Sequence, residues 1–252
     1  MTHTNTDLIA AVRAELARAA DPAKAPTMRA YMKSEMPYLG VPLPMVRAAC
    51  RIVFADHPLA SFAEWRDTAL SLWRTAQFRE ERYAALALTG DRRYRDYQRP
   101  AALPMYEEMI VSGAWWDYVD EVATHHIGPL LARYPETMRP ELRAWSRDDN
   151  LWKRRTAILA QVGFKSDTDE ELLFACIEPN LGDRDFFIRK AIGWALREYA
   201  KTNPRAVRRY VRDHEAQLSP LSRREAMKHL RDDENSGDPR PPSLIPPLSD
   251  TM

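Results

Sequence analysis

A tryptophan and an aspartate four residues apart, Trp116 and Asp120, occur in the segment GAWWDYVDEVATHHIG, residues 113–128. On a helix, positions i and i+4 share a face, so we expect the indole and the carboxylate to look into the same space. Trp115 and Asp117 are expected on other faces. Such a pair combines an aromatic face with one acid. The sequence leaves a second interpretation open, in which the two tryptophans anchor the core and Asp120 only pairs with an arginine.

Two later segments supply groups of matching chemistry. Trp194 and Arg197 are i and i+3 in FFIRKAIGWALREYAKT, where Lys190 precedes them, and Arg155 lies in DNLWKRRTAILAQ. Aromatic faces suit sugars or bases, and cations suit phosphates. Two tryptophans, one acid and several basic groups from successive parts of the chain therefore indicate a nucleic-acid site.

Several other enzyme classes lack their motifs here. The chain has no phosphate-cradling glycine loop, no GxSxG elbow and no HExxH or CxxC pattern, so we expect neither a metal nor a cofactor. His125 and His126 are adjacent and point about 100° apart on a helix, which suits capping or an interhelical hydrogen bond better than a shared metal. Cys50 and Cys176 are expected to fill the core.

The elements that position these groups are predicted to be all α-helical. Only 8 of the 252 residues are glycine, under half of the ~7% that is usual, apolar residues recur with helical spacing, and no stretch alternates like a strand. The predicted N-cap residues are Asp7, Ser61, Asn150, Asp167 and Ser219. Prolines close to predicted helix starts are Pro44, Pro135, Pro204 and Pro220.

Similar segments recur every 35 to 37 residues, beginning at Leu43, Phe78, Trp115, Leu151, Phe186 and Leu221. Each opens with a large apolar residue, and a second helix fills the rest of the period. This spacing predicts a right-handed α-solenoid of about six HEAT-like two-helix repeats with a concave binding face. Basic residues hold the fifth position in four of the six segments: Arg47, Arg82, Arg155 and Lys190.

The charge distribution explains why a net charge of +1 does not argue against a nucleic-acid partner. Residues 184–231 contain thirteen Lys or Arg against five Asp or Glu, an excess of +8, whereas residues 232–252 carry five acids against one arginine. Stacked repeats would align the fifth-position basic residues along the concave face, and such a stripe suits a phosphate backbone.

The chain is expected to divide into a HEAT-like repeat domain, residues 1–234, and a Pro-rich mobile tail, residues 235–252. No basic leader or long apolar run is visible, and the two cysteines make no disulfide framework. We therefore expect a cytoplasmic, nucleoid-associated monomer without a membrane segment or an obligate protein partner.

The motifs WWDYVD, DNLWKRRTAIL, DEELLFACI, FFIRKAIGWALREYAKT and LSRREAMKHL, with RAYMKSEMPYLGVPLPMVR near the N-terminus, strongly resemble the AlkD-type DNA alkylation repair glycosylases. The resemblance implies a HEAT-like solenoid that acts in base excision repair. It also implies hydrolysis of the N-glycosidic bond of positively charged N3- and N7-alkylated purines, such as 3-methyladenine and 7-methylguanine, in duplex DNA without base flipping. Activity on bulky cationic adducts is a further hypothesis.

The same resemblance assigns roles to residues. Asp120 matches the catalytic aspartate, and Trp116 and Trp194 match the tryptophans that contact the deoxyribose of the lesion. Arg155 matches an arginine at the DNA backbone, and Tyr31 matches a tyrosine near the lesion. The expected DNA-binding residues are Tyr31, Arg155, Lys190, Arg197, Arg47 and Arg82.

One well-placed acid agrees with this chemistry. Glycoside hydrolysis usually takes two carboxylates, one of which protonates the leaving group. A cationic alkylpurine departs as a neutral base and needs no such proton, so one carboxylate suffices. Two alternatives stay open: a catalytically silent HEAT-like module that binds distorted or branched DNA, and a protein-binding scaffold whose arginines hold acidic helices.

Overall fold

The computed structural model describes residues 3–230, and within them the chain forms helices and no strands. The predicted tail, 235–252, lies outside the described residues, as do the last four residues of the predicted domain. The α-helices are α1 (Thr6–Arg18), α2 (Ala25–Met32), α3 (Leu43–Asp56), α4 (Phe62–Arg74), α5 (Arg79–Thr89), α6 (Leu103–Gly113), α7 (Trp116–Val122), α8 (Gly128–Arg133), α9 (Pro135–Trp145), α10 (Leu151–Leu159), α11 (Glu170–Ile177), α12 (Phe186–Ala200), α13 (Pro204–Asp213) and α14 (Pro220–Met227).

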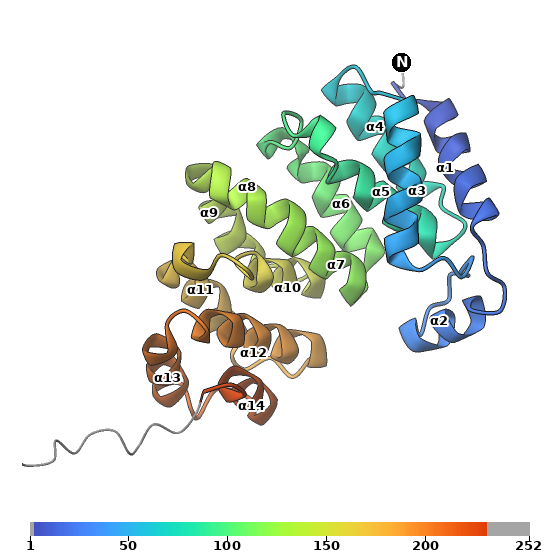
Figure 1. Ribbon diagram of the computed structural model, residues 1–252. Helices are drawn as coiled ribbons and strands as arrows, with labels where there is room; N and C mark the ends of the chain where they lie inside the picture. Colours follow the sequence, from blue (N-terminus) through green and yellow to red (C-terminus); the bar gives the residue numbers. More distant parts are fainter. Residues whose placement is uncertain (1–2, 231–252) are drawn as a thin grey trace, which may run out of the picture.

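The helices stack as successive antiparallel pairs into a curved α-solenoid (Figure 1). Each predicted repeat start falls within one residue of the start of a helix, and these helices are α3, α5, α7, α10, α12 and α14. They form one layer, in which each helix packs against the next. The all-α prediction and the 35 to 37 residue spacing are therefore confirmed for the described part of the chain.

Polar N-cap side chains accept backbone hydrogen bonds at seven of the fourteen described α-helices. Ser61, Asn150 and Ser219 accept hydrogen bonds from the backbone of the following turn, as predicted. The predicted caps at Asp7 and Asp167 are wrong. Asp7 lies inside α1, and Asn5 caps that helix. Asp167 lies in a 3-10 turn before α11, and Asp169 caps that helix. In both cases a second polar residue lies two positions away, and extended backbone at Asn5 and Asp169 decides which one caps.

The first turn of α5 is the point to which the N-terminal elements are tied. Glu80 is fully buried, and its carboxylate accepts hydrogen bonds from the backbone N–H groups of Leu39 (3.0 Å), Gly40 (2.9 Å) and Val41 (3.1 Å). Gly40 has φ +85°, and a Cβ there would lie 2.0 Å from the Asp21 carbonyl oxygen, so only glycine fits. This clamp fixes the loop that joins α2 to α3.

Both cysteines are buried in the core, and burial raises the pKa of each thiol to about 12. Their predicted role as core fillers is therefore confirmed. Between residues 3 and 230, no helix is both long and apolar enough to cross a membrane.

Replacing Glu80 by Gln should destabilise the fold by about 2–3 kcal/mol, because an amide nitrogen would face buried N–H donors that now share a carboxylate. Urea unfolding followed by circular dichroism measures the change. The matched control is Glu108→Gln, which removes a half-exposed pair with Arg74 and should cost under about 1 kcal/mol. Equal effects of the two substitutions would contradict this role for Glu80.

Candidate active site

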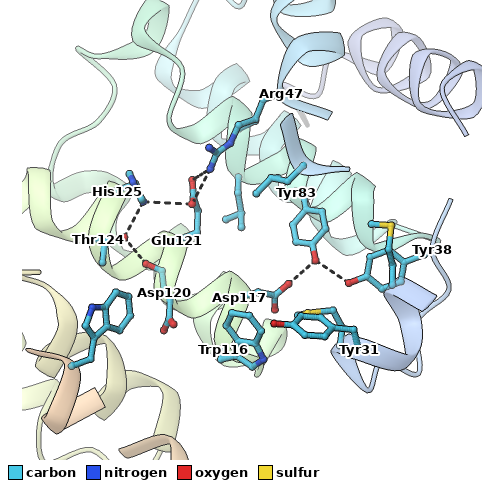
Figure 2. A pocket seen from close by; sticks show the side chains of 16 residues that line it. Tyr31, Tyr38, Arg47, Tyr83, Trp116, Asp117, Asp120, Glu121, Thr124 and His125 are labelled. Atoms are coloured by element: carbon cyan, nitrogen blue, oxygen red, sulfur yellow. Dashed lines mark hydrogen bonds and ion pairs between the residues drawn. The ribbon is translucent and has the colours of Figure 1, made fainter. Parts of the chain in front are cut away.

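A cavity of about 460 Å³ opens on the layer formed by α3, α5, α7 and α12, with α2 at one side (Figure 2). We call it the central cavity. Five of the nine predicted site residues line it, so the fold brings these five side chains together: Tyr31, Arg47, Trp116, Asp120 and Trp194. Its other walls are largely apolar, with Met28, Met32, Leu43, Leu86 and Ala87 among them. A carboxylate in this setting is far from bulk water on most sides.

Helix α7 delivers both Trp116 and Asp120. Trp116 is its first residue, and Asp120 follows one turn later on the same side, as the i, i+4 spacing predicts. A π turn, Ala123–Ile127, follows α7 directly. There the Thr124 hydroxyl donates a hydrogen bond of 2.7 Å to the Asp120 backbone carbonyl. Single π turns of this kind frequently occur at functional sites.

The Asp120 carboxylate is held by Arg155 of α10. The Arg155 Nε and Nη2 donate to its two oxygens at 2.7 Å and 2.8 Å, and Nη1 donates to the Phe187 carbonyl. Only 16% of the Asp120 side chain and 6% of the Arg155 side chain is exposed. Burial raises the pKa of Asp120 above its ordinary value, while Arg155 opposes that shift. The result is a desolvated carboxylate with one cationic partner and one side toward the cavity.

Both interpretations of the tryptophan–aspartate motif are right in part. Trp115 is a core anchor whose ring packs against those of Trp152 and Phe187, at centroid distances of 6.3 Å and 5.5 Å. Asp120 does pair with an arginine. Trp116, however, lines the central cavity beside Asp120, so the motif builds the core with one indole and the cavity wall with the other.

Asp117 was expected on another face, and this is wrong because it also lines the central cavity. Its oxygens accept two hydrogen bonds from Arg79 Nη2, at 2.6 Å and 2.7 Å, and one of 2.6 Å from the Tyr83 hydroxyl. The Tyr83 and Tyr38 hydroxyls lie 3.0 Å apart (Figure 2). The sequence analysis missed the group formed by Asp117, Arg79 and Tyr83. The segment FREERY does place Arg79 and Tyr83 one turn apart on α5, the first helix of the preceding repeat.

A third carboxylate, Glu121, also belongs to α7 and lines the central cavity one turn after Asp117. Arg47 of α3 contacts both of its oxygens, at 2.9 Å and 3.0 Å, and His125 Nδ1 lies 3.4 Å away (Figure 2). Arg47 remains 49% exposed, so it borders the cavity and solvent together. His126, by contrast, is buried and lies 2.8 Å from the Thr89 hydroxyl, which confirms the predicted interhelical hydrogen bond for that residue.

The predicted open stripe of fifth-position cations is wrong at Arg82 and Arg155. Arg82 lies over the Trp73 ring, 4.8 Å from its centroid, and Arg155 is buried against Asp120. Arg82 of α5 packs against α4 and Arg155 of α10 pairs with α7, so both cations are engaged by another helix. Lys190 and Arg197 instead both pair with Glu225 of α14.

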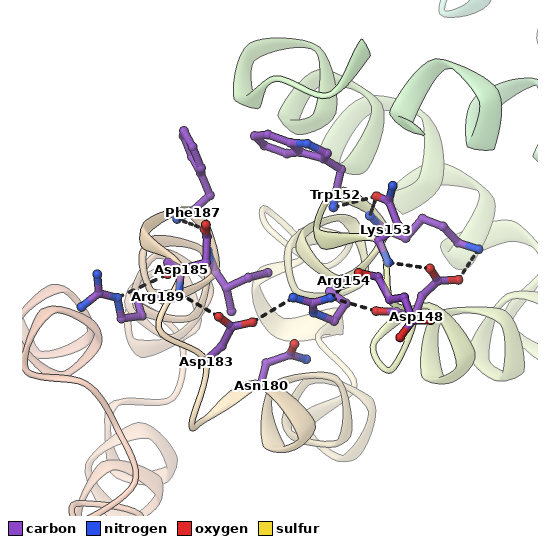
Figure 3. A network of polar contacts seen from close by, with 12 residues as sticks. Asp148, Trp152, Lys153, Arg154, Asn180, Asp183, Asp185, Phe187 and Arg189 are labelled. Carbon is purple, nitrogen blue, oxygen red and sulfur yellow. Dashed lines mark hydrogen bonds and ion pairs between the residues drawn. The ribbon is translucent and has the colours of Figure 1, made fainter. Parts of the chain in front are cut away.

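A polar network at the start of α10 and α12 fixes the helix that carries Arg155 (Figure 3). Arg154 donates to the Asp148 carbonyl (2.9 Å) and to the Asp183 carboxylate (2.9 Å). Asp183 in turn accepts from the backbone N–H of Asp185, which caps α12 through Phe187. These contacts tie α10 and α12 together at their N-terminal ends.

Comparisons with known proteins agree with this architecture. A solved structure from Enterococcus faecalis, described as a predicted DNA alkylation repair enzyme, is 30% identical with a TM-score of 0.75, over 84% of this chain and 97% of that chain. A solved structure of smu.31 from Streptococcus mutans UA159 is 15% identical with a TM-score of 0.57, over 75% of this chain and 93% of that chain, and shares the fold. Among curated proteins, none matches the chain.

The family model of the DNA alkylation repair enzyme matches residues 12–230, which include every residue of the central cavity. This chain therefore belongs to the DNA alkylation repair enzyme family.

Proposed function

We propose that the protein is a monofunctional DNA glycosylase that hydrolyses the N-glycosidic bond of cationic N3- and N7-alkylated purines in duplex DNA. It leaves an abasic site and does not flip the lesion out of the duplex. The observation that carries the proposal is the desolvated Asp120 carboxylate, which shares a largely apolar cavity with Trp116 and Trp194. Family membership supports DNA as the substrate.

The proposed chemistry depends on the hydrogen-bond acceptor sites of Asp120 that Arg155 leaves unfilled. Arg155 fills one acceptor site on each oxygen, whereas a carboxylate offers about four, so Asp120 keeps acceptor capacity toward the cavity. Positive charge that develops on the deoxyribose during bond cleavage is stabilised by this carboxylate more strongly than in water. The same oxygens can orient the attacking water. The cationic base departs neutral and needs no acid from the protein.

The aromatic walls complete the site. Trp116 and Trp194 come from α7 and α12, so two helices from different repeats frame the sugar. Indole faces attract a cation by about 1–2 kcal/mol when water is excluded. Tyr31 lines the central cavity from α2 and is 76% exposed, which supports its proposed contact with the duplex beside the lesion. Contacts of Arg47, Lys190 and Arg197 with DNA phosphates are part of the proposal and require exchange of their present carboxylate partners.

One observation favours a catalytically silent DNA-binding module as the second candidate. Both oxygens of Asp120 are already engaged by Arg155, as they would be in a purely structural pair. Incubation of the wild-type protein with an alkylated duplex separates the candidates, because only the glycosylase releases free base. Binding without release would favour the silent module.

Asp120→Asn should lower the single-turnover rate of 7-methylguanine release by about 10²–10³-fold, because a neutral amide cannot stabilise the developing cation. Duplex affinity should survive, since the phosphate contacts are untouched. Base release is measured by chromatography, and DNA binding by fluorescence anisotropy. The control is Glu108→Gln, which should behave as wild type. Full activity in a folded Asp120→Asn protein would refute the assignment.

The pH dependence should report the ionisation of Asp120. Activity requires the charged carboxylate, so the rate should fall as pH decreases through a pKa that burial raises above the ordinary 3.8. Arg155→Gln should move this limb to higher pH, because the guanidinium favours the charged form. Single-turnover rates between about pH 4 and pH 8, corrected for spontaneous base loss, test this. A limb that stays in place in Arg155→Gln would count against the pairing as its cause.

A further inference from the structure

The first turn of α7 lacks a cap of its own. Its N-cap residue, Trp115, makes no side-chain hydrogen bond to the turn, and the preceding Ala114 has a left-handed backbone with φ 43°. Ideal caps stabilise a helix start by about 1 kcal/mol. The seven-residue helix therefore begins at Trp116 without the usual local restraint, although Trp116 is the residue that must face the sugar.

Asp117, the second residue of α7, ties this first turn to another helix. It follows Trp116 directly, and Arg79 of α5 and Tyr83 together donate three hydrogen bonds to its carboxylate. Arg79 is itself fixed, because its guanidinium carbon lies 4.2 Å from the centroid of the Tyr118 ring. The exposed fractions are 6% for the Arg79 side chain and 13% for that of Asp117.

A buried ion pair of this kind contributes little net stability, because desolvation offsets most of the attraction. What it can contribute is a defined geometry. Asp117 differs from Asp120 in this respect: it accepts three hydrogen bonds from two residues, whereas Asp120 accepts two, both from Arg155. Asp117 is therefore poorly available to a substrate and well fixed in space.

We propose that Asp117 is a positioning residue, which acts with Arg79 and Tyr83 to hold the first turn of α7 and thereby set the Trp116 indole against the reacting sugar. This inference rests on the proposed glycosylase function. Helix α7 is thus held from both sides, with Asp117 tied to α5 and Asp120 tied to α10. The contact of Asp117 with α5 orients the Trp116 indole, and the contact of Asp120 with α10 orients the Asp120 carboxylate.

Two substitutions separate geometry from charge. Asp117→Asn removes the ion pair and also a negative charge close to Asp120, which could change the ionisation of that residue. Tyr83→Phe removes one hydrogen bond from Asp117 and leaves every charge in place. We expect base release at saturating protein to fall about tenfold in Asp117→Asn and about threefold in Tyr83→Phe, with unchanged duplex affinity.

The decisive experiment repeats both substitutions in a Trp116→Ala background. If Asp117 acts through Trp116, both rate effects should disappear there, because the indole to be positioned is gone. Glu108→Gln, which breaks the Arg74 pair between α4 and α6, is the matched control and should not change the rate in either background. Rate losses of the same size with and without Trp116 would overturn the proposal. Should Asp117→Asn fail to fold, the Tyr83→Phe pair of measurements decides alone.

A second readout needs no base release. The indole N–H resonance of Trp116, assigned by its loss in Trp116→Phe, should shift or broaden in Asp117→Asn and Tyr83→Phe but not in Glu108→Gln. An unchanged resonance in the two folded variants would overturn the positioning role even if the wild type releases no base. Absence of release from the wild type would refute the proposed function instead, so the two failures are distinguishable.

Discussion

The pairing of Asp120 with Arg155 is the interaction on which the site depends. A carboxylate in an apolar cavity resists ionisation, and burial does raise the pKa of Asp120. Without a cationic partner the pKa of this carboxylate would rise further, whereas several cations would saturate its oxygens. One guanidinium, bidentate and itself buried, keeps the charge while leaving acceptor capacity toward the cavity. The polar network at the start of α10 and α12 matters because it places this guanidinium.

The repeat architecture explains how such a pair forms between residues 35 positions apart. Successive helices of one layer lie side by side, so a residue of one repeat faces a residue about one repeat length away in the sequence. Arg79, Asp117, Asp120 and Arg155 all lie in this layer, on α5, α7 and α10. A solenoid thus converts a periodic sequence into ion pairs that cross from repeat to repeat, and α7 receives one from each side.

The helical class, the repeat boundaries and the convergence of Trp116, Asp120 and Trp194 could be predicted from the sequence, because spacing within a helix and between repeats fixes them. The partners of the charged residues could not. Arg82 and Arg155 share one repeat position, yet Arg82 packs on the Trp73 indole and Arg155 forms an ion pair with Asp120. Which partner a long side chain reaches depends on the neighbouring helix, and no local pattern records it. Asp117 was missed for the same reason, since its partner Arg79 lies 38 residues earlier.

Under the proposed function, discrimination between damaged and normal purines follows from the leaving group more than from binding. A normal purine departs poorly unless it is protonated, and each carboxylate of the central cavity is already paired with an arginine. The walls otherwise consist mainly of methionine, leucine and aromatic side chains, and the Tyr38 and Tyr83 hydroxyls are already hydrogen-bonded within the protein. A site built in this way stabilises charge on the sugar and leaves the base to depart unaided. Only a base that already carries a positive charge departs without being protonated by the protein. The alkylation therefore supplies the activation of the leaving group that a general acid supplies in other glycoside hydrolases.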